Sequence, residues 1–250
     1  MIRAVLMTMA VCLIALPSAA LAQDAQGSDA AKELQSLQAE QSQAVQEHRA
    51  KVRAAETREE RAKLTAENPA EKFAPRFLEL AEKYPGTEES LTALQVAMRA
   101  RDSEVQNKAL AIILRDHKES KALGTMVSGW ARDASKADAL RQIIDASPHR
   151  EVKGLATYSL ATLSLRSARN DEAKREAAIK LLQQAVEVYG DVEIRNRTIK
   201  QVAGGQLTEI TKLQIGMEAP DIEGTDVDDV AFKLSDYRGK VVVLDFWGDW

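Results

Sequence analysis

The sequence predicts a mainly α-helical chain of solenoid-like helical hairpins that ends in a short β-rich segment. Between residues 69 and 213, capping residues and Pro or Gly stops bound a series of short stretches with apolar residues at helical spacing. Alternate helix starts fall near residues 69, 103, 135 and 171, a repeat of about 34 residues. Such a period is typical of the paired helices of an α-solenoid, and an irregular helical bundle is the alternative. Apolar residues make up 45% of the chain but aromatic residues only 4%, so we expect a core of Ala and Leu, which suits helices.

The first residues have the pattern of an export signal. Arg3 supplies a positive charge, residues 4–16 are apolar, and Ala20-Leu-Ala22 is a small-x-small cleavage pattern. We therefore expect a signal peptide at 1–22 and a periplasmic or extracellular location, with a buried N-terminal helix as the alternative. No later stretch approaches about 18 consecutive apolar residues, so we expect no membrane span.

The single cysteine, Cys12, lies within this predicted signal. A lipid-anchored cysteine is the alternative, but Val11 precedes it where a small residue is needed. After cleavage the chain would hold no thiol, which excludes disulfides, thiolate catalysis and cysteine metal sites from these residues. The net charge of −4 argues against nucleic acid, which needs a basic face. We expect no cofactor.

Residues 23–68 predict a long polar helix. They are rich in Ala, Gln, Glu, Lys and Arg, and the heptad seam becomes polar after Leu34 and Leu37, so a coiled coil is not expected. We expect a solvated helix instead. His48 has no second ligand at metal spacing and is predicted to lie on the surface.

Residues 69–213 predict eight short helices that form a helical-repeat domain. Their expected starts are Asn68-Pro69, Thr87, Asp102 or Ser103, Ser120, Ser135, Ser147-Pro148, Asn170 or Asp171, and Asp191. No catalytic constellation is evident among them. Trp130 fits an apolar stripe and is predicted to be core. His117 and His149 are expected to cap helices or lie on the surface. The period near 34 residues and the stretches 77–86 and 181–190 resemble tetratricopeptide-like repeats, whose concave face would suit a protein partner.

The sequence pattern changes from helical to β-type spacing near residue 214. Residues 240–246 form a β-type run that is apolar apart from Lys240 and Asp245, and it predicts a strand buried on both faces. Asp226 and Asp228 could suggest calcium, but an EF-hand loop would need Gly and Glu at 231 and 237, where Ala and Tyr stand. We therefore expect no metal.

Three stretches of this segment match one family in the right order. They are Ile215-Gly-Met-Glu-Ala-Pro-Asp-Ile222, Ser235-Asp-Tyr-Arg-Gly-Lys240 and Asp245-Phe-Trp-Gly-Asp-Trp250. Together they resemble the start of thioredoxin-like proteins, and more closely the extracytoplasmic TlpA/redoxin branch. The resemblance covers about residues 213–250. The family often has Gly where Asp229 stands, but Asp tolerates the left-handed backbone of such turns.

The resemblance implies a thiol–disulfide oxidoreductase that acts on a protein disulfide or thiol. In that family the Trp-x-x-Trp motif leads into Cys-x-x-Cys, so we expect this chain to be a fragment of a longer protein with Cys at 251 and 254. Asp245 matches the buried acid that accepts a proton from the resolving thiol, although a capping Asp is the alternative. Trp247 and Trp250 match the aromatic positions that flank the active site. The 250 residues themselves are expected to be inactive.

Two other functions stay open. One is a redox-dead envelope module that binds a protein partner through its helices. The other is a peroxiredoxin-type antioxidant enzyme, although Phe-Trp-x-x-Trp departs from the Pro-x-x-x-Thr-x-x-Cys loop of that class. The predicted domains are a signal peptide (1–22), a long polar helix (23–68), a helical-repeat domain (69–213) and an incomplete redoxin domain (214–250). A hairpin with one further strand is too little to be stable alone, so we expect 217–250 to be loosely held or disordered.

Overall fold

The computed structural model describes residues 18–168 and 171–245, with side chains from residue 29 onward. The chain is mainly α-helical with a few short strands, which confirms the predicted fold class. It divides between Ser120 and Lys121 into two compact units, called here the first and the second unit. Arg3 and Cys12 lie outside the described residues. No helix in the described part of the chain combines the length and the apolarity needed to cross a membrane.

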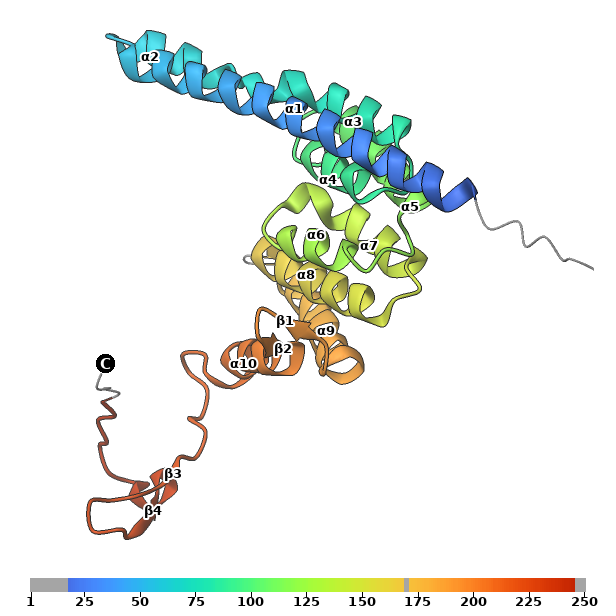
Figure 1. Ribbon diagram of the computed structural model, residues 1–250. Coiled ribbons are helices and arrows are strands. Elements are labelled where there is room, and N and C mark those ends of the chain that lie inside the picture. The colour runs from blue at the N-terminus through green and yellow to red at the C-terminus, as the bar shows by residue number, and fades with distance from the viewer. Residues whose placement is uncertain (1–17, 169–170, 246–250) are drawn as a thin grey trace, which may run out of the picture. The chain divides into compact units, whose positions relative to one another are not determined.

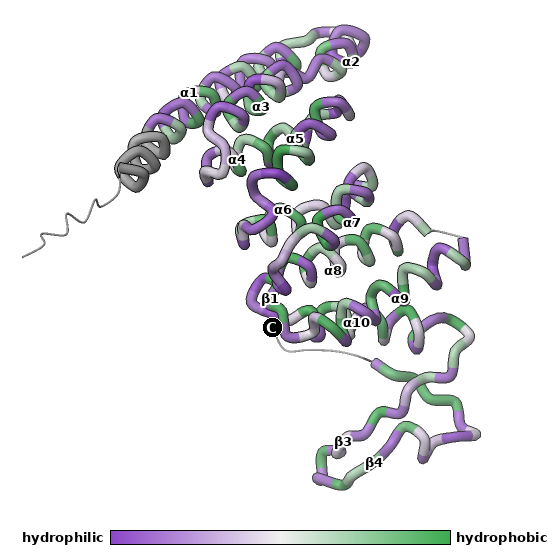
Figure 2. Tube along the Cα trace, turned by 90° about the vertical axis from the view of Figure 1, so that its right-hand side faces the viewer, coloured by the Kyte–Doolittle hydropathy of each residue, from purple (hydrophilic) through white to green (hydrophobic). Residues whose placement is uncertain are grey.

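The first unit is built on one long helix (Figure 1). Its elements are α1 (Ser18–Ala54), α2 (Arg58–Ala66), the 3-10 turn η1 (Pro69–Phe73), α3 (Ala74–Lys83), α4 (Glu88–Ala97) and α5 (Ser103–Asp116). α1 packs against η1, α3 and α4, and α3 packs against α4 and α5. Leu34 and Leu37 of α1 are buried. The later residues of the seam, from Gln41 to Lys51, are half-buried or exposed, and Ala55 after the helix is buried again. The helix is therefore polar along most of its length, as Figure 2 shows.

The long polar helix predicted for residues 23–68 is broken at residues 55–57. Thr57 is the N-cap of α2, because its side-chain oxygen accepts from the backbone N–H of Glu60 at 3.1 Å. The carbonyl oxygen of Ala55 accepts from the guanidinium of Arg61 at 2.9 Å. These contacts satisfy backbone groups that a continuous helix would have paired internally. The break therefore has a local cause that composition alone did not indicate.

His117 is buried, which differs from the surface or capping position predicted for it. Its side chain is 4% exposed, and its Nε2 lies 3.1 Å from the Oγ of Ser90. Its backbone does close α5, because the His117 N–H donates to the carbonyl of Ile113. The prediction overlooked Ser90, which lies on α4 and gives the ring a polar partner in the core.

The second unit is organised around α8. Its elements are α6 (Leu123–Gly129), η2 (Ala134–Lys136), α7 (Ala137–Ala146), α8 (Arg150–Ala168), α9 (Glu172–Tyr189), β1 (Glu193–Ile194), β2 (Arg197–Thr198), α10 (Ile199–Lys212), β3 (Glu223–Thr225), β4 (Ala231–Lys233) and η3 (Leu234–Tyr237). α8 packs against α6, α7 and α9, and α9 packs against α10. A buried cluster joins α8, α9 and α10: Ala161, Leu182, Ala185, Val192, Ile199 and Ala203. Trp130 is 6% exposed, which confirms its predicted place in the core.

Helices α8 and α9 approach closely at Gly154. A Cβ added at Gly154 would lie 2.8 Å from the Cβ of Tyr189, a distance that real Cβ atoms do not tolerate. Beyond the end of α9, the guanidinium of Arg150 makes two hydrogen bonds to the Asp191 carboxylate, at 2.7 and 2.9 Å. The small residue and the ion pair together set how α9 lies on α8.

Several predicted helix starts are confirmed by their side-chain caps. Thr87, Asp102 and Asp171 accept from backbone N–H groups at the starts of α4, α5 and α9. Asn68 caps η1 at Pro69, also as predicted. Other starts differ by a few residues: α6 begins at Leu123, and Asp133 rather than Ser135 caps the turn before α7.

The eighth helix begins at Ile199 and not at Asp191. The antiparallel hairpin β1–β2 occupies the intervening residues and pairs Ile194 with Arg197. Arg195 and Asn196 form its two-residue turn with φ of 49° and 62°, as a type I′ turn requires. Thr198 and Gln201 then form a capping box that starts α10. The turn lacks the Gly that usually marks such hairpins, so the sequence did not reveal it.

Candidate functional site

The segment that carries the family resemblance folds as a small antiparallel hairpin. β3 pairs with β4 so that Glu223 lies opposite Lys233 and Gly224 opposite Phe232. The Lys233 ammonium contacts the Glu223 carboxylate at 2.6 Å. The backbone N–H of Leu234 donates to the carbonyl of Ile222, which extends the pairing by one bond.

Acidic residues build the turn of this hairpin. One carboxylate oxygen of Asp226 accepts from the backbone N–H groups of Asp228 and Val230, both at 2.9 Å. Asp229 has a φ of 59°, which confirms that an Asp occupies the left-handed position expected there. The Asp226 carboxylate is thus engaged in shaping the turn. Among the residues described, no three His, Cys, Asp or Glu side chains gather as metal ligands.

Two of the three resembling stretches are held together by Asp221 and Ser235. The Asp221 carboxylate accepts from the backbone N–H of Ser235 at 2.8 Å and from its hydroxyl at 2.7 Å. The hydrogen bond from the Ser235 side chain is the largest cause of the lowered pKa of Asp221. Glu218 and Arg238 form a second link between the same stretches, with an N–O distance of 2.6 Å.

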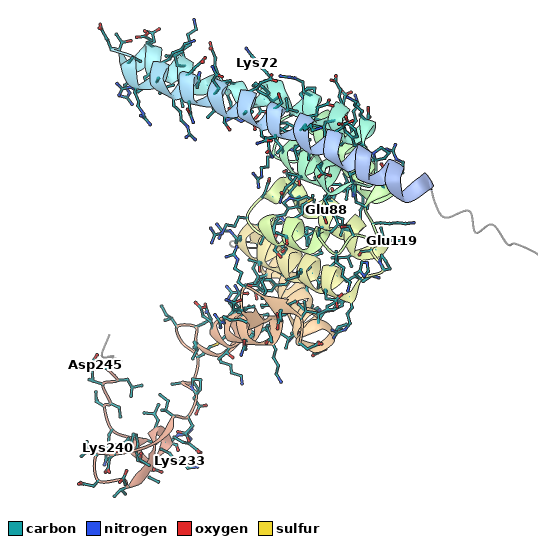
Figure 3. All side chains as sticks on the ribbon, viewed as in Figure 1. Lys72, Glu88, Glu119, Lys233, Lys240 and Asp245 are labelled. Carbon is teal, nitrogen blue, oxygen red and sulfur yellow. The ribbon has the colours of Figure 1, made fainter. Side chains whose placement is uncertain are left out.

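Aromatic contacts complete the hairpin. The rings of Phe232 and Tyr237 meet edge to face, with centroids 6.5 Å apart. The ammonium of Lys240 lies 5.6 Å from the centroid of Tyr237. Figure 3 shows Lys233 and Lys240 on this part of the chain. Residues of the first two resembling stretches therefore contact each other and form a self-contained element with the hairpin.

The strand predicted for residues 240–246 is not formed over residues 241–245. This stretch has no regular secondary structure, and its side chains are exposed. No strand of the described chain pairs with it, so its backbone groups lack the partners that define a strand. Val241 and Val243 are 98% and 88% exposed.

Of the predicted site residues, the structure describes one. Asp245 is exposed in this structure (Figure 3), whereas the resemblance implies a buried acid. Trp247 and Trp250 lie outside the described residues. The role of Asp245 stays a prediction, because no described group is placed to exchange a proton with it.

Among the described residues of the helices, the hydroxyl of Ser90 lies beside the His117 ring, but both side chains are buried in the core and out of reach of a substrate. His48 is half-buried and lines a surface groove on α1, and His149 is half-buried before α8. One group of polar side chains in the second unit was not predicted from the sequence. Arg132, Arg166, Arg195 and Arg197 line a common cleft. Arg195 and Arg197 share the β1–β2 hairpin, whereas Arg132 follows α6 and Arg166 lies on α8, so the one signal in the sequence was the Arg-Asn-Arg turn at 195–197.

Comparison with known proteins finds similarity over a short stretch. The chain is 44% identical over 46 residues to the thiol-disulfide oxidoreductase ResA of Bacillus thuringiensis subsp. konkukian, which is 18% of this chain and 27% of that protein. It is 51% identical over 43 residues to ResA of Geobacillus kaustophilus, which is 17% of this chain and 25% of that protein. The chain thus spans about a quarter of the length of the curated relatives it matches. No family model and no solved structure matches it. The matches support a relation to thioredoxin-like redox proteins over this stretch.

Proposed function

We propose that the chain is the N-terminal part of an exported thioredoxin-like thiol–disulfide oxidoreductase of the TlpA/redoxin type. The observation that carries the proposal is the similarity to ResA proteins. The hairpin supports it, because Asp221 and Ser235 join two stretches whose residues resemble the family. The substrate class is a disulfide or thiol of a protein.

The proposed chemistry needs a Cys-x-x-Cys after Trp250, at the start of a helix. The helix dipole and exposed amides there stabilise the first thiolate. This thiolate attacks a substrate disulfide, forms a mixed disulfide and releases one substrate thiolate. The second cysteine then attacks the mixed disulfide, which frees the reduced substrate and oxidises the pair. Asp245 would accept the proton of the second thiol, and Trp247 and Trp250 would flank the pair.

We further propose the domain division that the sequence suggests. A signal peptide at 1–22 directs the protein to the periplasm or outside the cell. The polar helical segment (23–68), which α1 and α2 divide between them, and the helical repeats (69–213) precede the redoxin segment (214–250). The packing of successive helices in the second unit, α7 on α8 and α8 on α9, is compatible with helical hairpins. These helices would hold a protein partner close to the redox domain.

The experiment starts by reading the gene beyond Trp250. If it encodes the expected cysteines, the extended protein should reduce insulin with dithiothreitol as the electron source. The 250-residue chain contains only Cys12, so it should show no turnover and serves as the matched control. Serine at the first cysteine should abolish activity. Absence of both cysteines from the gene would contradict the redox assignment.

The second candidate is a redox-dead binding module. It is favoured by the exposed position of Asp245, which a reductase would need near its resolving thiol. In that case an extended protein would lack turnover and still bind its partner through the helices. The insulin assay therefore separates the two functions.

A further inference from the structure

A cleft of about 550 Å³ opens on the surface of the second unit. Residues of α6, α8, α10 and the β1–β2 hairpin line it, together with Ala131 and Arg132 after α6. Its volume lies in the range of natural small-ligand sites. It shares no residue with the β3–β4 hairpin.

The lining is cationic. Arg132, Arg166, Arg195 and Arg197 contribute to it, and no Asp or Glu does. Within the described part of the chain, none of the four takes part in an ion pair. This contrasts with Arg150 and Arg141 of the same unit, each paired to an acid. A guanidinium presents a planar fork of donors that matches a carboxylate. Four such groups on one cleft therefore favour an acidic ligand.

The cleft also contains buried polar atoms that lack partners. The Oγ1 of Thr162 and the Oε1 of Gln206 are inaccessible and have no hydrogen-bond partner among the described residues. Both residues line the cleft. Buried polar atoms in native proteins are nearly always paired, because leaving one unpaired costs stability. The amide oxygen of Gln206 accepts only, so it suits an N–H donor from a ligand.

The hairpin that carries two of the arginines holds an uncommon backbone. Arg195 and Asn196 both have positive φ. Asn, like Gly, adopts this conformation readily, but Arg does not. Arg at such a position is unusual, and backbone of this kind persists where the surrounding structure holds it. The turn keeps Arg195 and Arg197 on the same cleft.

We propose that this cleft binds an acidic peptide segment of a partner protein. The arginines pair with its carboxylates, and the side chains of Gln206 and Thr162 turn toward its backbone N–H groups as it binds. Its aliphatic side chains contact Tyr158, Ile194 and Val202, which also line the cleft. A free phosphate would engage the arginines alone and leave the amide oxygen and the apolar side chains uncovered. The proposal names the partner chemistry of the helical segment, so it rests on that part of the proposed function and is independent of the redox activity.

The test uses the 250-residue chain and a fluorescein-labelled peptide in which Asp and Glu alternate with Val and Ile. Fluorescence anisotropy should show saturable binding that weakens with salt. The double variant Arg166→Gln/Arg195→Gln should lose at least about tenfold in affinity. The matched control Arg141→Gln/Lys180→Gln removes two charges outside the cleft, each from an existing ion pair, and should bind like the wild type. Circular dichroism melts of each variant check that the fold is kept.

Two comparisons separate this site from general anion binding. A peptide with Asn and Gln in place of the acids should bind at least about tenfold more weakly. At constant ionic strength, inorganic phosphate at millimolar concentration should weaken peptide binding only slightly, because phosphate engages the arginines alone. Equal binding to the Arg166→Gln/Arg195→Gln chain, or complete displacement by phosphate, would overturn the proposal.

A further variant tests the amide. Gln206→Leu removes it at unchanged net charge and should weaken peptide binding, and an unchanged affinity would also contradict the proposal. Insulin reduction by the extended protein is measured separately, so either function can fail alone.

Discussion

The Nε2 atom of His117 lies 3.1 Å from the Oγ of Ser90, and both side chains are buried in the first unit. The Ser90 hydroxyl also donates to the carbonyl of Ala81 at 3.2 Å. Because that hydroxyl has a single proton, the Ser90 oxygen accepts from His117, which therefore carries its proton on Nε2. Burial lowers the pKa of His117 below 6.5, and the charge of Asp116 offsets part of this effect.

The first prediction follows from this lowered pKa. The unfolded chain binds the His117 proton more readily than the folded chain, so this group's contribution to stability is complete above its unfolded pKa of about 6.5 and falls as the pH drops below it. The wild type should therefore lose more melting temperature between about pH 7.5 and 5.5 than His117→Gln does. Thermal melts at both pH values measure this difference. Equal losses in the two proteins would contradict it.

The second prediction concerns the close approach of α8 and α9. Gly154→Ala should destabilise the chain by about 1–3 kcal/mol, because the new methyl group would collide with Tyr189. Gly205→Ala is the matched control, since nothing lies within 4 Å of a Cβ there. It should stabilise the chain by about 0.5–1 kcal/mol through helix propensity. Urea unfolding curves of the two variants should move in opposite directions.

The third prediction separates two roles of Asp133. Its carboxylate accepts from the backbone N–H of Ser135 at 3.0 Å and lies 3.8 Å from the ammonium of Lys136, which is 1% exposed. Burial lowers the pKa of Lys136, and Asp133 partly offsets this. Asp133→Ala removes both roles and should cost about 1–2 kcal/mol, whereas Asp133→Asn keeps the cap and should cost less.

A variant at the partner completes this test. Lys136→Met keeps the volume of the side chain and removes a buried charge. It should be as stable as the wild type to within about 1 kcal/mol, or more stable. A large loss in Lys136→Met would show that the ammonium itself stabilises the turn.

The fourth prediction concerns the hairpin. Asp221→Ala removes both hydrogen bonds from Ser235, so amide exchange in residues 222–234 should quicken. The helical melt should not change, because no described residue after Lys212 is buried. For the same reason, a chain that ends at Ile215 should melt like the full chain and be more soluble. Strong protection of residues 241–245 in a monomer would contradict this.

The sequence predicted those features that depend on neighbours in the chain. Thr87, Asp102 and Asp171 cap their helices because an N-cap needs only a suitable side chain and the next turn. Asp229 likewise takes its left-handed backbone from the turn around it.

Features that depend on distant residues were missed or remain predictions. The burial of His117 depends on Ser90, 27 residues earlier. The four-arginine cleft draws on separate elements that only folding brings together. The buried place predicted for Asp245 needs neighbouring strands, which the described residues do not provide. Local pattern alone therefore could not supply these positions.

The connection between α10 and β3 has a kinetic consequence. None of the described side chains from Leu213 to Ala219 is buried, Ile215 is fully exposed, and Gly216 has a φ of 89°. Such a segment acts as a short tether. A partner captured by the cleft would then meet the redoxin segment at an effective concentration on the order of millimolar. The rate at which the bound partner meets the redoxin segment would depend on the length of the tether and not on free diffusion. Lengthening the tether with Gly and Ser should therefore slow the reaction of bound partners and leave the reaction of free partners unchanged.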